Sequence, residues 1–194
     1  MAAENSYYSR IPINKVNHFE NLLSRYEISD ETQVGLLKAS YLAFWGCVWC
    51  LSWNFLVVTN LWFEKGDASK TKAFILAFAY MTLGIPTAFV SWFRSLWEAF
   101  RTGDGAMFEK FFVFSLVHIG LCIFASVAPP VPVLSDSLTG FFSALHMFYD
   151  GPGVYGFLYY IGAVLFGLEA GLSIWLLNRV NAYYRERGLF LEMV

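Results

Sequence analysis

The stretch Ala39–Phe63 reads ASYLAFWGCVWCLSWNFLVVTNLWF and contains no Asp, Glu, Lys or Arg. About 20 apolar helical residues cross the ~30 Å hydrocarbon core of a bilayer, so this stretch predicts a membrane-spanning helix. A helix on a soluble core would show a polar stripe at every third or fourth position, and this one shows none. The stretch therefore decides the fold class, which is an α-helical membrane protein.

Three further stretches share these properties: Ala73–Phe93, Phe111–Val127 and Val154–Leu177. The chain is 57% hydrophobic and only 14% charged, whereas a soluble domain has about a quarter charged residues. Continuous apolar runs also argue against a membrane β-barrel, whose strands alternate apolar and polar residues. We predict an all-α membrane protein of four transmembrane helices in an antiparallel bundle, with the third span extended by a turn from Met107–Lys110.

The four-span domain, residues 39–177, separates two tails. Residues 1–38 form the N-terminal tail, in which apolar residues recur at helical spacing over Val16–Leu23 and predict an amphipathic helix. Asp30 starts a capping pattern that leads into the first span. Residues 178–194 form the C-terminal tail. No cleavable signal peptide is expected, because no basic start precedes an apolar core.

Lys and Arg near the spans predict the orientation, because cytosolic loops carry an excess of both. Eight of them flank one side of the membrane and three flank the other. We therefore expect both tails in the cytosol. The first group is Arg25, Lys38, Arg94, Arg101, Lys110, Arg179, Arg185 and Arg187, and the second is Lys65, Lys70 and Lys72.

The loop after the third span opens with Pro129-Pro130-Val131-Pro132. Proline cannot continue a helix, so the span ends there. The following residues, Leu134–Tyr149, alternate Phe and Leu with small polar residues. We expect this segment to lie along the lumenal membrane surface.

Between the second and third spans, the sequence SWFRSLWEAFR covers Ser91–Arg101. Read as a helix, it places Arg94, Glu98 and Arg101 on one face and aromatic residues on the other. Aromatic rings favour the headgroup level and arginine pairs with lipid phosphates, so we predict an in-plane amphipathic cytosolic helix. Such a helix is either a plain membrane anchor or a functional lipid sensor, and the pattern favours neither. The residues predicted to contact lipid headgroups or a partner are Trp92, Phe93, Arg94, Leu96, Trp97, Phe100, Arg101 and Lys110.

Two ionisable residues stand out inside the spans, since such groups are costly in a membrane. Glu169 lies roughly 12 Å and His118 roughly 10 Å from the cytosolic ends of their helices. We predict a hydrogen bond or ion pair between them. It is either a structural contact between the third and fourth spans or part of a proton relay or ion pathway, and the first is favoured because polar groups do not line the full depth.

Ala163, Gly167 and Gly171 follow one another at four-residue spacing in the fourth span. Small residues at this spacing permit close approach of two membrane helices. At 100° per residue the stripe points nearly opposite Glu169. The stripe therefore predicts either self-association or packing within one bundle.

Other functional classes find no support in the sequence. The net charge of −2 argues against a nucleic-acid-binding protein, which would show a basic face. Cys47 and Cys50 have redox-motif spacing but lie in an apolar span without further ligands, so no metal is expected. No catalytic motif is present, so we predict neither an enzyme nor a cofactor.

Several motifs resemble the secretory carrier membrane proteins (SCAMPs), and the similarity covers the chain from about Tyr26 onward. In that family the loop between spans two and three reads approximately Cys-Trp-Tyr-Arg-Pro-Leu-Tyr, followed after one residue by Ala-Phe-Arg. The stretches Phe124–Val131, Ser137–Phe141 and Ala182–Arg185 resemble plant members in particular. The residues here that match the family's loop are Trp92, Arg94, Leu96, Ala99, Phe100 and Arg101.

The resemblance implies a vesicle protein of the trans-Golgi network, endosomes and plasma membrane with a role in exocytosis. It also implies that the cytosolic loop binds phosphoinositides and fusion or GTPase proteins. Ser91 and Ser95 replace the family's Cys and Pro, and Glu98 lowers the basic charge. The family's N-terminal Asn-Pro-Phe repeats and coiled coil are not found, so recruitment of endocytic adaptors through them is not expected.

Two alternatives stay open at this point. One is a small channel or transporter that uses His118 and Glu169. The other is a structural subunit of a larger membrane assembly, as a homo-oligomer or a hetero-complex, which the small-residue stripe favours.

Overall fold

A computed structural model describes residues 30–131 and 134–186, and all regular secondary structure in these two ranges is helical. The amphipathic helix expected at Val16–Leu23 lies outside the described residues. The elements are α2 (Glu31–Lys65), α3 (Ala68–Ala88), the π-helical turn η4 (Phe89–Phe93), α4 (Arg94–Thr102), α5 (Gly105–Val127), α6 (Leu134–Ser137), α7 (Phe141–Asp150) and α8 (Gly153–Glu186).

Four helical stretches are long and apolar enough to cross a membrane, which confirms the predicted fold class. They are Glu31–Glu64, Ala68–Thr102, Gly105–Val127 and Gly153–Glu186. Their outward side chains are apolar: Leu42, Leu83, Leu121 and Leu168 are each more than 60% exposed. A continuous apolar surface of this kind is unfavourable in water but favourable in contact with lipid tails.

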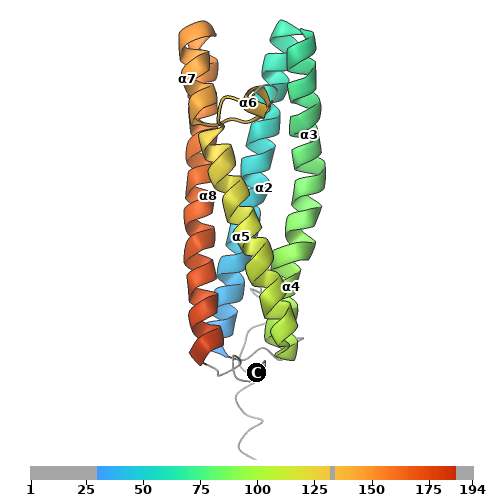
Figure 1. Cartoon of the computed structure of the whole chain (residues 1–194), viewed down its shortest axis with the longest axis vertical. Coiled ribbons are helices and arrows are strands. Elements are labelled where there is room, and N and C mark those ends of the chain that lie inside the picture. The colour runs from blue at the N-terminus through green and yellow to red at the C-terminus, as the bar shows by residue number, and fades with distance from the viewer. Residues whose placement is uncertain (1–29, 132–133, 187–194) are drawn as a thin grey trace, which may run out of the picture.

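The helices run antiparallel, and the start of α2 and the end of α8 lie at the same end of the bundle (Figure 1). We name this the tail end, and the opposite end, with the α2–α3 turn, α6 and α7, the loop end. Helix α2 packs against both α3 and α8, and α5 packs against α8. The resulting order of neighbours is α3, α2, α8 and α5.

Aspartates cap three of the helices, as their short side chains allow. Asp30 Oδ1 accepts a hydrogen bond from the Thr32 amide at 2.9 Å, which confirms the expected start of the first helix. Asp67 and Asp104 cap α3 and α5 in the same way. Gly66 and Gly103 end α2 and α4 in the left-handed conformation, with φ of 59° and 69°, which glycine adopts without strain.

The helix expected between spans two and three is continuous with the second span. Pro86 lies inside α3, where its missing N–H and its ring disturb the hydrogen-bond ladder. The π-helical turn η4 follows this disturbance, and the helix then continues as α4. Ala68–Thr102 therefore forms one helical stretch. The amphipathic segment is therefore an extension of α3 toward the tail end, not a separate helix (Figure 1).

The segment after α5 folds back onto the bundle. Ala128, with φ of 45°, ends α5, and the following α6 contacts α3. Helix α7 then packs along α8 as the two helices of a hairpin (Figure 1). The sequence predicts a segment lying along the membrane surface, but Leu134–Tyr149 instead forms two helices that are held by the spans. The cause is a set of buried polar contacts described below.

Candidate functional site

His118 on α5 and Glu169 on α8 meet, as the sequence predicts. His118 Nε2 lies 3.4 Å from Glu169 Oε1, and the two side chains are 12% and 3% exposed. The Ser173 hydroxyl, one turn along α8, lies 3.3 Å from the same carboxylate oxygen and donates to it. The carboxylate thus has two polar neighbours in the apolar interior, and each lowers the cost of burying it.

Gly46 on α2 makes room for Glu169, which the sequence reasoning missed. A Cβ at this position would overlap Glu169 Oε2. The carboxylate therefore fills the space that a side chain would occupy on α2. A glycine inside a long apolar helix is the signal that could have indicated this close approach. Three helices, α2, α5 and α8, enclose the site.

Three cysteine thiols are buried near the site, two on α2 and one on α5. Cys122 Sγ lies 3.6 Å from His118 Nε2, and Cys47 and Cys50 are also buried free thiols. Within residues 30–131 and 134–186, no group of three or more His, Cys, Asp or Glu has the geometry of a metal site. Because the same histidine nitrogen faces both Cys122 and Glu169, the trio is not the thiol–imidazole–carboxylate relay of a nucleophilic enzyme, which uses both ring nitrogens.

A second polar cluster lies nearer the loop end, around Asn54 on α2. The Asn54 amide donates to the Ser137 carbonyl at 3.0 Å, and its oxygen accepts from the Thr139 backbone N–H at 2.8 Å. The Thr139 hydroxyl donates to the same oxygen at 3.1 Å. Asn54, Ser137 and Thr139 are fully buried. One side chain therefore satisfies the irregular backbone between α6 and α7.

The outer rim of this cluster is held by Asp136. Its carboxylate pairs with Lys70 at 3.1 Å and accepts from Ser69 at 3.1 Å, and both partners lie at the start of α3. The Tyr159 hydroxyl on α8 donates to the Asp136 carbonyl at 3.3 Å. Non-helical backbone at membrane depth is tolerated only where protein satisfies it, and these contacts meet that condition.

The predicted small-residue stripe is divided by the structure. Ala163 is buried against α5, where its carbonyl accepts from the Ser126 hydroxyl at 2.8 Å. Gly167 is exposed but lies beside the same helix, since a Cβ there would be 3.4 Å from Ser126 Oγ, whereas Gly171 is exposed away from this contact. Among the glycines of α8, the tightest contact is at Gly162, where a Cβ would overlap the Thr139 side chain. Ala163 and Gly167 therefore lie on the side of α8 that faces α5, and Gly171 lies outside this contact.

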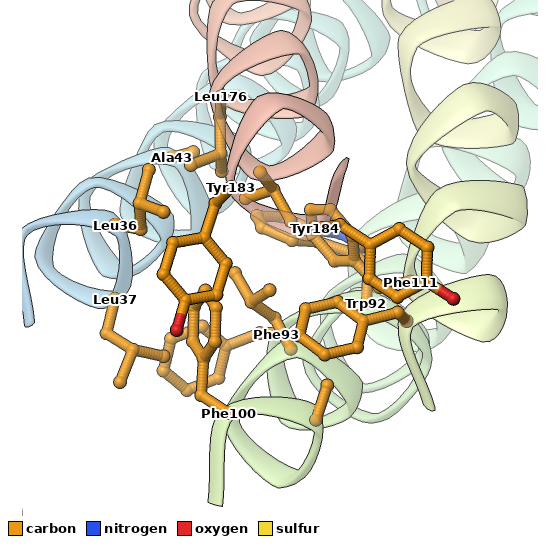
Figure 2. Packing of buried hydrophobic residues seen from close by; sticks show 14 of the residues in the cluster. Leu36, Leu37, Ala43, Trp92, Phe93, Phe100, Phe111, Leu176, Tyr183 and Tyr184 are labelled. Carbon is orange, nitrogen blue, oxygen red and sulfur yellow. The ribbon is translucent and has the colours of Figure 1, made fainter. Parts of the chain in front are cut away.

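The apolar face of α4 and η4 packs on protein, and this corrects the expectation that it faces the membrane surface. Trp92, Phe93, Leu96 and Phe100 are 3%, 8%, 0% and 7% exposed, and Trp97 is half-buried. Figure 2 shows Trp92, Phe93 and Phe100 directed into a cluster with residues from α2, α5 and α8. The Phe100 ring lies edge-on to Tyr183 of α8, with centroids 5.3 Å apart.

The reason is that α2 and α8 extend beyond the predicted spans at the tail end. Leu36 and Leu37 precede the expected first residue of span one, and Val180, Tyr183 and Tyr184 follow the expected end of span four. They provide the protein surface on which the apolar face of α4 packs, where the sequence predicts contact with lipid. The i, i+3, i+4 spacing of the last three is the signal that could have indicated it.

The polar face of the same helix remains accessible. Arg94, Arg101 and Lys110 are exposed. Arg94 Nε donates to Glu98 Oε1 at 2.8 Å, an i, i+4 pair on an exposed helix face. A pair of this kind contributes only about 0.3–0.5 kcal/mol, so it can yield to another anion.

We predict that Glu169→Gln changes the stability of the bundle by less than about 1 kcal/mol, because the amide oxygen still accepts from Ser173. Glu169→Leu should cost about 2 kcal/mol, since Ser173 and His118 both lose their partner. Unfolding in mild detergent, followed by tryptophan fluorescence, measures both. Equal losses for the two variants would contradict this description of the site.

Comparison with known proteins places the chain. The SCAMP family model matches residues 23–187. The chain is 43% identical to secretory carrier-associated membrane protein 6 of Oryza sativa subsp. japonica, over 82% of this chain and 58% of the relative. It is 40% identical to secretory carrier-associated membrane protein 2 of Arabidopsis thaliana, over 88% and 60%. No solved structure matches the chain with significance.

A third relative, the secretory carrier-associated membrane protein of Pisum sativum, is 40% identical over 87% of this chain and 58% of its own length. The chain thus spans about three fifths of the length of the curated relatives it matches. The matched region contains all four apolar helices and both polar clusters. The chain belongs to the SCAMP family.

Proposed function

We propose that this protein is a non-enzymatic four-span component of post-Golgi vesicle membranes, acting in exocytosis and endosomal recycling. The observation that carries the proposal is the match of the whole four-helix region to a family whose members are named for secretory carriers. The trans-Golgi network, secretory and endosomal vesicles and the plasma membrane are the compartments in which it would reside.

The tail end of the bundle faces the cytosol in this proposal. Among the described residues, six exposed Lys and Arg residues lie there, on α2, α4, α5 and α8, whereas at the loop end Lys72 is exposed and Lys70 pairs with Asp136. This asymmetry is the one that orients membrane proteins. The exposed cations of the tail end are Lys38, Arg94, Arg101, Lys110, Arg179 and Arg185.

Lipid contact, in the same proposal, falls on the cationic edge formed by Arg94, Arg101 and Lys110. The aromatic face of α4 is occupied by protein contacts. Each Lys or Arg near an anionic leaflet contributes about 1 kcal/mol, so three give a modest affinity that a phosphoinositide would raise. Trafficking or fusion proteins with an acidic surface would engage the same edge.

The burial of Glu169 supports a structural role over proton conduction. Its carboxylate is 3% exposed and is enclosed by Gly46, His118 and Ser173. A conducting path would need polar groups that continue from this site to both ends. Proton flux in reconstituted vesicles that disappears in both His118→Ala and Glu169→Gln would establish the transporter instead.

Localisation and topology test the proposal together. We expect a fluorescently tagged chain expressed in plant cells to mark moving puncta and the plasma membrane, and epitopes at both termini to be digested by protease only after the plasma membrane is opened. A tagged copy that stays in the endoplasmic reticulum, or termini that are cut on intact protoplasts, would contradict the proposal. Proximity labelling in the same cells would identify the partner proteins.

A further inference from the structure

A cavity of about 540 Å³ lies between α3 and α5. Its floor is formed by α2, through Cys47, Cys50 and Leu51, and by Phe166 of α8. Pockets for small molecules have volumes of about 300–1,000 Å³, so this one is large enough to hold a ligand or part of one. Its lining shares His118 and Cys122 with the site around Glu169, but the structural role proposed for that site assigns no function to the cavity itself.

Helix contacts close the cavity toward both ends of the bundle, and the cavity is open between α3 and α5. Toward the tail end, η4 and α4 pack against α5, and toward the loop end α6 packs against α3. Between these contacts α3 and α5 barely touch. The lining residues Leu83 and Leu121, on the two opposing helices, are 68% and 62% exposed. The opening therefore faces sideways, into the hydrocarbon of the membrane.

The chemistry of the wall suits a hydrocarbon occupant. Carbon atoms form most of the lining. Of the few polar groups, His118 is engaged by Glu169 and Cys122, and the Ser91 hydroxyl donates to the Thr87 carbonyl of its own helix. A lipid tail needs no hydrogen-bond partner, and it is the apolar substance that surrounds a four-span protein at this depth.

Cations lie where the headgroup of such a lipid would be. Lys110 precedes the lining residues Phe114, Val117 and Leu121 by four, seven and eleven positions, so it shares their face of α5. On the opposite wall, α4 begins with Arg94 directly after η4, which contributes the lining residues Ser91 and Trp92. Both cations are exposed. At ~1.5 Å per residue, Lys110 is about 10 Å from Val117 and about 16 Å from Leu121, within reach of one tail.

We propose that the cavity between α3 and α5 binds one acyl chain of a phospholipid, whose phosphate lies between Arg94 and Lys110. The four-residue spacing on α5, and the start of α4 directly after η4, place these two cations at the tail-end margin of the two walls. Arg94 reaches the phosphate with its terminal nitrogens, because Glu98 engages only its Nε among the described residues. The assignment to the cytosolic leaflet rests on the orientation proposed above, whereas the binding itself does not.

Photocrosslinking of the full chain tests the proposal. The protein is reconstituted with a phosphatidylcholine whose acyl chain carries a diazirine, and labelled peptides are identified by mass spectrometry. We expect labelling of Leu83, Val117 and Leu121, and a severalfold loss of it in Val117→Trp, in which the larger ring fills the opening. Leu116→Trp is the matched control, since Leu116 neighbours Val117 on α5, is 60% exposed and does not line the cavity.

Equal labelling in the two tryptophan variants would overturn the proposal, because it would mean ordinary contact with surrounding lipid. Should Val117→Trp fail to fold, Leu121→Trp provides the same test at a more exposed position. Preferential labelling of the cavity by a photoactivatable sterol would also overturn it. In the charge experiment, Arg94→Gln with Lys110→Gln should weaken retention of phospholipid through purification, and unchanged retention would remove the phosphate site. All readouts use purified protein, so they can succeed even if the proposed trafficking function fails.

Discussion

Replacing Asn54 with alanine is expected to destabilise the bundle by at least about 3 kcal/mol. The change removes the partner of the Ser137 carbonyl, the Thr139 N–H and the Thr139 hydroxyl, and each buried polar group left unsatisfied costs about 1–3 kcal/mol. Asn54 is eleven residues from the end of α2, or roughly 16 Å from the loop end. Water cannot easily reach this depth to replace the lost bonds.

The unfolding free energy in mild detergent measures this effect, and hydrogen exchange of Ser137–Gly140 shows where it acts. Asn60→Ala is the matched control, because Asn60 is an exposed residue on the same helix and its amide donates only to the Leu56 carbonyl one turn earlier. The control should stay within about 0.5 kcal/mol of the original chain. Similar losses for Asn54 and Asn60 would refute the role assigned to Asn54.

Replacing Gly162 with alanine is expected to cost about 3 kcal/mol, the upper end of the usual cost of overpacking. The added methyl group would overlap the Thr139 side chain and approach its carbonyl oxygen to 2.7 Å. Thr139 cannot withdraw, because both its N–H and its hydroxyl are bonded to Asn54. The strain should therefore separate α8 from the α6–α7 connection, and a larger residue such as valine should prevent folding.

Gly171→Ala on the same helix provides the contrast. In the described part of the chain, no atom outside the backbone of α8 lies within 4 Å of the position that its Cβ would take. Alanine also favours a helix over glycine by about 0.8–1.0 kcal/mol. This variant should be neutral or slightly more stable when both proteins are unfolded under the same conditions. A Gly171→Ala protein as unstable as Gly162→Ala would indicate that Gly171 packs against a second chain.

The locations of the four spans follow from the sequence because a bilayer leaves few alternatives. Unpaired backbone groups and charged side chains have a high free energy in hydrocarbon. Long apolar helices avoid both, because they satisfy their backbone hydrogen bonds internally. The contact between His118 and Glu169 could be anticipated for the same reason. Each group lies at a similar depth, and a buried carboxylate needs a partner.

The environment of Ser91–Arg101 could not be predicted from its own residues. An amphipathic helix has the same pattern whether its apolar face meets lipid or protein, since both are apolar. The outcome depends on how far α2 and α8 extend at the tail end, where Leu36, Leu37 and Tyr183 are available to cover Trp92 and Phe100. Helix ends carry mixed residues, and hydropathy alone places them poorly.

The sequence by itself determined that this chain is a four-span helical membrane protein with an ionisable pair in its interior, because the free energy of burying charge and peptide groups depends on composition along a segment. Only the tertiary structure decided that Asn54 holds the α6–α7 connection, that Gly46 and Gly162 accept their neighbours, and that a cavity opens between α3 and α5. These features arise from side chains far apart in sequence, such as Asn54 and Thr139. Their complementarity exists only after the helices have packed.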